Sequence, residues 1–163
     1  MLGAGALLLV VDAPPRRTGP ESVRGPRVLR VRAASVRGVE IRAGEHQVTA
    51  VRATDGWQLD DRPAPPGAVD ALDTLVATLA ELRAVDAFRP ERGAQLGLDP
   101  PTATITLRTA HRQIVLQLGA PNASGGSVYA ERPGHPRIFL VGTGLLSALE
   151  RVFYQADQLA RTQ

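Results

Sequence analysis

The sequence predicts an α+β fold, with a mainly antiparallel sheet packed by one central amphipathic helix and a C-terminal helix. Short segments alternate apolar and polar residues between turn signals, which predicts a meander of about six to seven strands. Two longer stretches carry apolar residues at helical spacing. The length of 163 residues suits one domain, which we expect to cover residues 28–163.

The first strands are expected between residues 28 and 59. Apolar residues mark one or two strands over 28–41, and residues 48–51 alternate. Asp55 and Gly56 then form a hairpin signal before Trp57, the only tryptophan. A single tryptophan beside a turn favours a buried position in the core of a small sheet over a role in recognition.

Both helices are predicted from apolar stripes. Pro66 suits a helix start, with Asp70 and Asp73 near the positive end of the dipole, and we expect this helix over residues 68–84. Its stripe consists of Val69, Leu72, Leu75, Val76, Leu79 and Leu82. The C-terminal stripe consists of Leu145, Leu149, Val152, Ala156 and Leu159.

Residues 90–96 are expected to form one helical turn that ends at Gly97 in the left-handed capping conformation. Asp99 precedes Pro100 and is expected to be extended, which directs the chain into a strand over 102–108. We expect Leu98 to be buried and the Asp99 side chain to cap backbone amides. A functional carboxylate at Asp99 is the less favoured alternative.

Later strands follow the same alternation. On the strand over 102–108, Ala103, Ile105 and Leu107 face one side, while threonines and Arg108 face the other. Residues 114–118 repeat the pattern. Segments 128–132 and 137–141 form a second hairpin across residues 133–136.

Composition excludes several function classes. The chain has no cysteine, which removes disulfides and thiolate chemistry, and no lysine, which removes P-loop and Schiff-base chemistry. The net charge is +3, and every basic side chain other than histidine is arginine. Several arginines lie in the predicted linker and the others alternate with acids, without stacking aromatics. The sequence therefore does not favour nucleic-acid binding.

No catalytic, cofactor or metal site is predicted. Residues 142–147 follow a strand and open a helix, but the third glycine and the ribose-binding acid of a dinucleotide site are missing. His46, His111 and His135 fall in predicted turns without a second ligand at zinc spacing. The glycine-rich loop over 122–126 is expected to be a connection between strands.

The N-terminal part of the sequence consists of an apolar run followed by a proline- and arginine-rich segment. Residues 2–11 are apolar, but as a helix they would span only about 15 Å, half of a bilayer core. Residues 12–27 are rich in proline and arginine and are expected to be a linker. Three interpretations of residues 2–11 stay open: a truncated membrane anchor, which we favour, a degenerate export signal, or a buried or frayed segment. Arg16 and Arg17 would favour a cytoplasmic domain.

Seven residues carry a resemblance in their order along the chain: Trp57, Gly97, Leu98, Asp99, Pro100, Gly119 and Tyr129. With the turn at Pro133 and Gly134, the chain resembles the Domain of Unknown Function 4340 family over residues 28–153. The resemblance implies a bacterial envelope protein with one N-terminal membrane anchor, an extracytoplasmic domain and an association with ATP-binding-cassette exporters. It implies no catalytic residue.

The resulting hypothesis is a non-enzymatic, membrane-tethered interaction module of the bacterial envelope, auxiliary to an ABC-type transporter. We expect membrane attachment through the N-terminus, a protein partner, no cofactor, no metal and no nucleic acid. The alternative is a soluble small-molecule or peptide-binding domain with a groove between the helix around Leu75 and the sheet. A hydrolase or transferase is the least favoured class.

Overall fold

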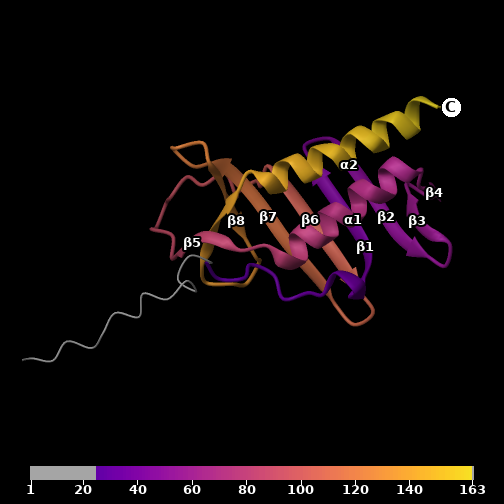
Figure 1. Ribbon diagram of the computed structural model, residues 1–163. Coiled ribbons are helices and arrows are strands. Elements are labelled where there is room, and N and C mark those ends of the chain that lie inside the picture. Colours follow the sequence, from indigo (N-terminus) through magenta and orange to yellow (C-terminus); the bar gives the residue numbers. More distant parts are fainter. Residues whose placement is uncertain (1–24, 163) are drawn as a thin grey trace, which may run out of the picture.

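Nine antiparallel strands form a single sheet in the computed structural model, which describes residues 25–162 (Figure 1). The strands are β1 (Val36–Ala43), β2 (His46–Ala53), β3 (Gly56–Leu59), β4 (Arg62–Pro63), β5 (Ala84–Phe88), β6 (Ala103–Thr109), β7 (Gln113–Pro121), β8 (Ser127–Glu131) and β9 (Ile138–Gly142). Their order across the sheet is β4-β3-β2-β1-β6-β7-β8-β9-β5. A short 3-10 turn, η2 (Ala33–Ser35), precedes β1.

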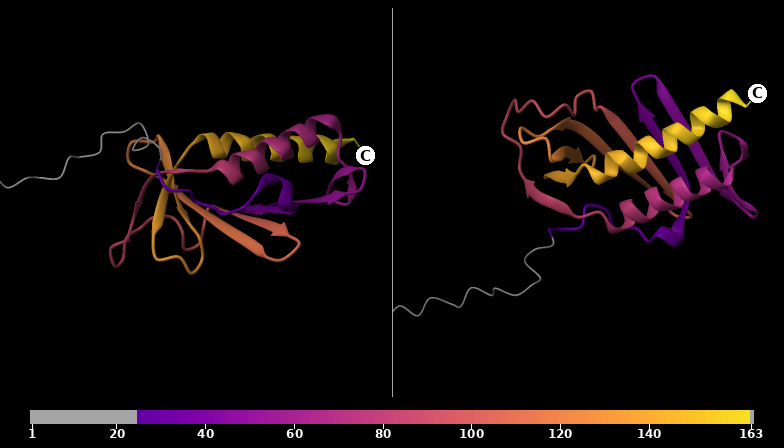
Figure 2. Two further views of the ribbon diagram at one scale, coloured as in Figure 1. Left: turned by 60° about the horizontal axis from the view of Figure 1, so that its bottom comes forward. Right: turned by 45° about the horizontal axis from the view of Figure 1, so that its top comes forward.

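Helices α1 (Pro66–Glu81) and α2 (Gly144–Arg161) lie side by side on one face of the sheet (Figures 1 and 2). Strands β4 and β5, which flank α1 in the sequence, are the two opposite edges of the sheet. With 16 residues, α1 is about 24 Å long and carries the chain across the sheet between them. The predicted α+β class, with one central and one C-terminal helix, is confirmed.

The core fills the space between the helices and the sheet. Alternate strand residues such as Ile41, Ile105 and Leu116 belong to the same buried cluster as Leu75 of α1 and Leu145 of α2, and each is at most 1% exposed. The predicted alternation on β6 is confirmed, because its apolar residues are buried while its threonines are half-buried and Arg108 is exposed. Apolar burial at this density is the main stabilising term of such a fold.

The uncovered face of the sheet is polar around β1 and β6. Glu40 of β1 accepts ion pairs from Arg42 at 2.7 Å and from Arg108 of β6 at 2.9 Å. Thr104 and Thr106 lie beside them on β6 and help line a small hollow. Glu40 thus compensates the charge of two exposed arginines on this face.

The structure corrects the expected number of strands and the end of the first helix. The sheet has nine strands, two or three more than the six to seven expected, and the prediction did not place the edge strands β4 and β5. The first helix ends at Glu81, not at residue 84, and Ala84 already pairs with Val141 in β5. The buried Leu82 and Ala84 continue the apolar pattern of the helix, so periodicity alone could not separate the helix from the edge strand.

The first described residues are fixed at this edge of the sheet. The Ala84 N–H donates to the Pro26 carbonyl, and the Val28 N–H donates to the Leu82 carbonyl, both at 2.9 Å. Val28 and Leu29 are then buried in the core. Within residues 25–162, no helix is long and apolar enough to cross a membrane. Residues 2–11, where an anchor or export signal is expected, lie outside the described part.

Candidate functional site

The two glycine motifs of the chain, around Gly97 and Gly119, meet in space. The loop after β5 crosses the end of β7, where the Ala120 N–H donates to the Leu96 carbonyl at 2.8 Å. A Cβ atom at Gly119 would lie 2.2 Å from the Leu96 oxygen, and one at Gly97 would lie 2.6 Å from the Ala120 nitrogen. Both positions therefore require glycine because backbone passes against backbone.

The expected left-handed conformation of Gly97 is confirmed, with φ of 68°, but its expected role is wrong. Residues 90–96 form no helix, so Gly97 caps none; it lets the loop approach β7. Leu98 is half-buried over Gly119, where we expected full burial. Sequence periodicity could not reveal this crossing, because the partner strand lies beyond the loop.

Asp99 and Pro100 form a turn shortly before β6. Their peptide bond is cis, and a bridge between Leu98 and Pro101 closes the turn. Asp99 is exposed, and its carboxylate has no hydrogen-bond partner among the residues that the structure describes. The expected capping of backbone amides by Asp99 is therefore not observed. The exposed Asp99 helps to line a hollow under the loop, together with Glu91 and Glu131.

Trp57 is 3% exposed, as expected of a core residue. Its indole Nε1 donates to Asp73 Oδ1 of α1 at 2.9 Å. The Arg52 guanidinium lies 4.5 Å from the ring centroid and also pairs with Asp73 at 2.8 Å. These contacts fasten β2 and β3 to α1, so Trp57 is accounted for as a structural residue.

Tyr129 and Phe88 form a smaller apolar contact on the other face of the sheet. Their rings meet edge to face with centroids 6.2 Å apart, and Phe88 pairs across the ladder with the buried Ile138. This patch lies at the β5 end of the sheet. Tyr129 therefore also has a packing role in this structure.

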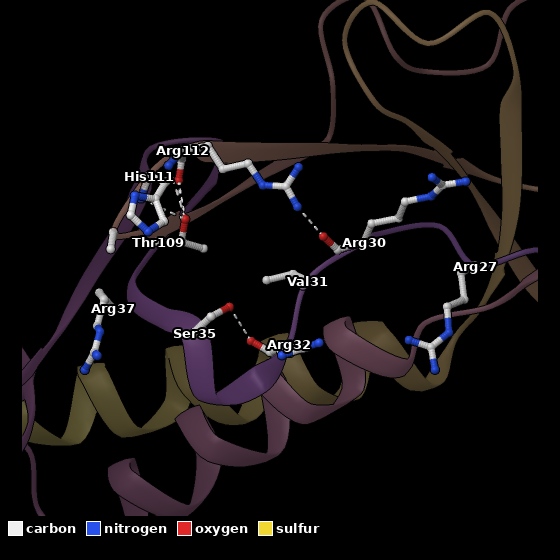
Figure 3. A pocket seen from close by; sticks show the side chains of 10 residues that line it. Arg27, Arg30, Val31, Arg32, Ser35, Arg37, Thr109, His111 and Arg112 are labelled. Atoms are coloured by element: carbon white, nitrogen blue, oxygen red, sulfur yellow. Dashed lines mark hydrogen bonds between the residues drawn. The ribbon is translucent and has the colours of Figure 1, made fainter.

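Five arginines line a surface cavity of about 530 Å³. It lies between the segment that leads into β1 and the turn that joins β6 to β7. We call it the arginine basin. Its lining residues are Arg27, Arg30, Val31, Arg32, Ser35, Arg37, Thr109, Ala110, His111 and Arg112. Figure 3 shows Arg112 along one rim, Ser35 and Arg32 along the opposite rim, and Val31 between them.

The basin is cationic without internal compensation. Five arginines and no acid line it, and all five arginines are exposed. Among residues 25–162, the arginines in salt bridges are Arg42, Arg52 and Arg108, and none of these lines the basin. The basin therefore concentrates guanidinium groups that lack a described carboxylate partner.

Local hydrogen bonds fix the two walls. The Thr109 hydroxyl accepts from the backbone N–H groups of His111 and Arg112, at 3.3 and 3.2 Å. The Arg112 guanidinium donates across the basin to the Arg30 carbonyl, and the Ser35 hydroxyl donates to the Arg32 carbonyl at 2.7 Å (Figure 3). The walls are thus joined by contacts that leave the side chains of Arg30, Arg32 and Arg37 without a described partner.

Sequence reasoning missed this basin. One signal was present: residues 22–39 hold five arginines and no acid. The assignment of residues 12–27 to a linker divided that run, and nothing in the sequence places Arg112 beside it. The partner wall comes from a hairpin turn far along the chain, which only the pairing of β1 with β6 brings near.

The other predicted sites are not assembled. Leu75 is fully buried, and it lines none of the four hollows described for residues 25–162. A hollow of about 480 Å³ lies instead between exposed sides of α1 and α2, near Asp70 and Tyr154. The described residues contain no cluster of three or more metal-ligating side chains.

Fold and site together define a sheet domain with a two-helix cover, a glycine-dependent loop crossing and a cationic basin. The family model described as "Domain of unknown function (DUF4340)" matches residues 57–154, and the chain belongs to this family. No curated protein and no solved structure matches the chain. The match begins at Trp57 and includes the loop crossing, His111 and Arg112, whereas Arg27 to Arg37 of the basin precede it.

Proposed function

We propose that this chain is a non-enzymatic interaction module of the bacterial envelope, tethered to a membrane through its N-terminus and auxiliary to an ABC-type transporter. The observation that carries the proposal is the position at which the N-terminal segment enters the domain. Pro26 and Val28 are fixed by backbone hydrogen bonds to the segment between α1 and β5. The sequence before them is a proline- and arginine-rich segment after the apolar run 2–11. A tether there would hold this side of the domain toward the bilayer.

Charge on the same segment supports this orientation. Arg27, Arg30 and Arg32 follow the junction directly and are exposed. Basic residues close to an anionic bilayer surface are attracted to its headgroups. A domain held by residues before 25 would therefore be favoured with its arginine basin near the lipid headgroups.

The association with a transporter and the extracytoplasmic side rest on the family resemblance. Residues Arg16 and Arg17, directly after the apolar run, favour the opposite side by the positive-inside tendency. Protease added to intact spheroplasts measures the side directly. An extracytoplasmic domain is digested before lysis, whereas protection until lysis would contradict that placement.

The tether is tested by fractionation of cells that express the chain together with the native upstream region of its gene. We expect membrane association that resists high salt, and release when residues 2–11 are deleted. Replacement of Arg16 and Arg17 by Gln is the matched control, and it should leave the protein in the membrane fraction. Salt distinguishes the two modes because it weakens electrostatic attachment but not apolar burial.

Two results would contradict the tether. Release by salt would indicate attachment through arginines alone, and recovery in the soluble fraction would remove membrane attachment altogether. The second result would favour the alternative of a soluble small-molecule or peptide-binding domain.

A further inference from the structure

We infer that the arginine basin is a binding site for a phosphate-bearing anion. The inference does not depend on the membrane tether, since it follows from the described basin alone. The arginines of the site come from two walls, with Arg30, Arg32 and Arg37 before and within β1 and Arg112 on the β6–β7 turn. Figure 3 shows the Arg112 side chain reaching into the basin and those of Arg30 and Arg37 at its margins.

The first step is the hydrogen-bonding character of the basin. The hydroxyls of Ser35 and Thr109 are already engaged with backbone groups of their own walls. What the basin offers to a ligand is therefore mainly guanidinium N–H donors. A matching ligand presents acceptors and negative charge, as phosphate and carboxylate groups do.

The second step is the number of charges. Five guanidinium groups without an acid on the lining are poorly matched by one carboxylate, which carries a single charge. A phosphate group carries up to about two charges and three acceptor oxygens, so it can engage several arginine forks from different directions. The cavity of about 530 Å³ has room for more than one such group.

The third step concerns the organisation of the walls. The Arg112 guanidinium already reaches the Arg30 carbonyl, and the Thr109 hydroxyl holds the turn that carries it. Val31, 8% exposed, gives the basin a packed floor. Part of the ordering cost of binding is thereby met before a ligand arrives.

The lining also argues against a nucleic-acid strand. Single-stranded nucleic acids are held by aromatic side chains on which bases stack, together with basic groups. His111 is the one ring in the lining, and no Trp, Tyr or Phe accompanies it. The chemistry points to the phosphate itself, carried by a soluble polyphosphate or by the headgroup of an anionic phospholipid.

The test uses the full chain, two phosphate-bearing probes and, for comparison, a single-stranded oligonucleotide. Binding of inorganic tripolyphosphate is measured by isothermal titration calorimetry, and binding of phosphatidylglycerol vesicles is compared with binding of neutral phosphatidylcholine vesicles by co-sedimentation. The test variant carries Arg30→Gln and Arg32→Gln, whose side chains have no described partner. The control variant carries Arg92→Gln and Arg137→Gln, which remove equal charge from exposed positions outside the basin.

We expect the test variant to lose binding by about tenfold or more, because a charged hydrogen bond contributes about 1.5–3 kcal/mol. The control variant should lose less than about twofold, since it removes only general charge. Both variants should keep the wild-type melting temperature. Loss confined to vesicles identifies the headgroup as the source, and loss confined to tripolyphosphate identifies a soluble phosphate.

Three results would overturn the inference: no binding of either probe by the wild type, equal losses in the test and control variants, or tighter binding of a single-stranded oligonucleotide that the test variant abolishes. The last would make the basin a nucleic-acid site. A chain that binds tripolyphosphate but does not fractionate with membranes would support this inference while contradicting the tether, so the two proposals fail separately.

Discussion

Gly119 lies directly beneath the Leu96 carbonyl at the loop crossing. Replacing Gly119 by Ala places a Cβ atom 2.2 Å from that oxygen, and the loop or β7 must move. We expect a loss of about 1–3 kcal/mol in the free energy of unfolding, the usual cost of overpacking, measured by urea denaturation. Gly126→Ala is the matched control, because its nearest atom is 4.0 Å away. Equal stability of both variants would show that the loop does not cross β7 as described.

Asp73 is the acceptor for the buried indole of Trp57. We expect Asp73→Ala to lower the free energy of unfolding by about 1–3 kcal/mol, because the Trp57 N–H loses its partner. Asp70→Ala, one turn earlier on the same helix and exposed, should cost less than about 1 kcal/mol. Both are measured by thermal and urea unfolding. A larger loss for Asp70 would contradict the role assigned to the indole contact.

For Gly97 and for the arginine basin, the sequence predicted local backbone conformation better than it predicted which residues lie in contact. A positive φ at Gly97 follows from the chemistry of glycine, which is local. That Gly97 lies against Ala120 depends on the path of a loop after another strand, and no local pattern encodes it. The arginine basin shows the same limit, because Arg30 and Arg112 belong to separate walls.

A helix or strand could be predicted where its burial leaves a periodic pattern of apolar residues in the sequence. The β6 alternation and the two apolar stripes reflect burial on one face, which leaves a period in the sequence. Strand β4 has two residues and β5 lies at the sheet edge, so neither leaves a clear period. Strand order was not predictable either, because α1 carries the chain between opposite edges.

The buried apolar stripe of α1 also predicts how much stability is lost when one of its side chains is shortened. Leu75 is fully buried in the middle of α1, and Leu75→Ala should cost about 2–5 kcal/mol through lost burial and a cavity. Val85 on β5 is 70% exposed, and Val85→Ala should change stability by less than about 0.5 kcal/mol. Denaturant titration of both variants measures the contrast. A small effect at Leu75 would mean that α1 is not seated on the sheet.

At the scale of the whole molecule, the stability of the core depends on the first buried residues of the described chain. Val28 and Leu29 are at most 1% exposed, and the hydrogen bond from Val28 to the Leu82 carbonyl joins them to the end of α1. Val28 and Leu29 thus close the described part of the core on this side. The tether proposal requires that the core fold without residues 2–11, because a segment held in a membrane cannot also fill the core.

Two deletions test this closure. A chain that starts at Gly25 should unfold with the same free energy as the full chain, within about 0.5 kcal/mol. A chain that starts at Arg30 loses both buried side chains, each of which contributes about 1.5–3 kcal/mol, so it should be destabilised by about 3–6 kcal/mol. Urea denaturation followed by Trp57 fluorescence measures both. If the first deletion also costs several kcal/mol, residues before 25 pack into the domain, and the membrane tether loses its main support.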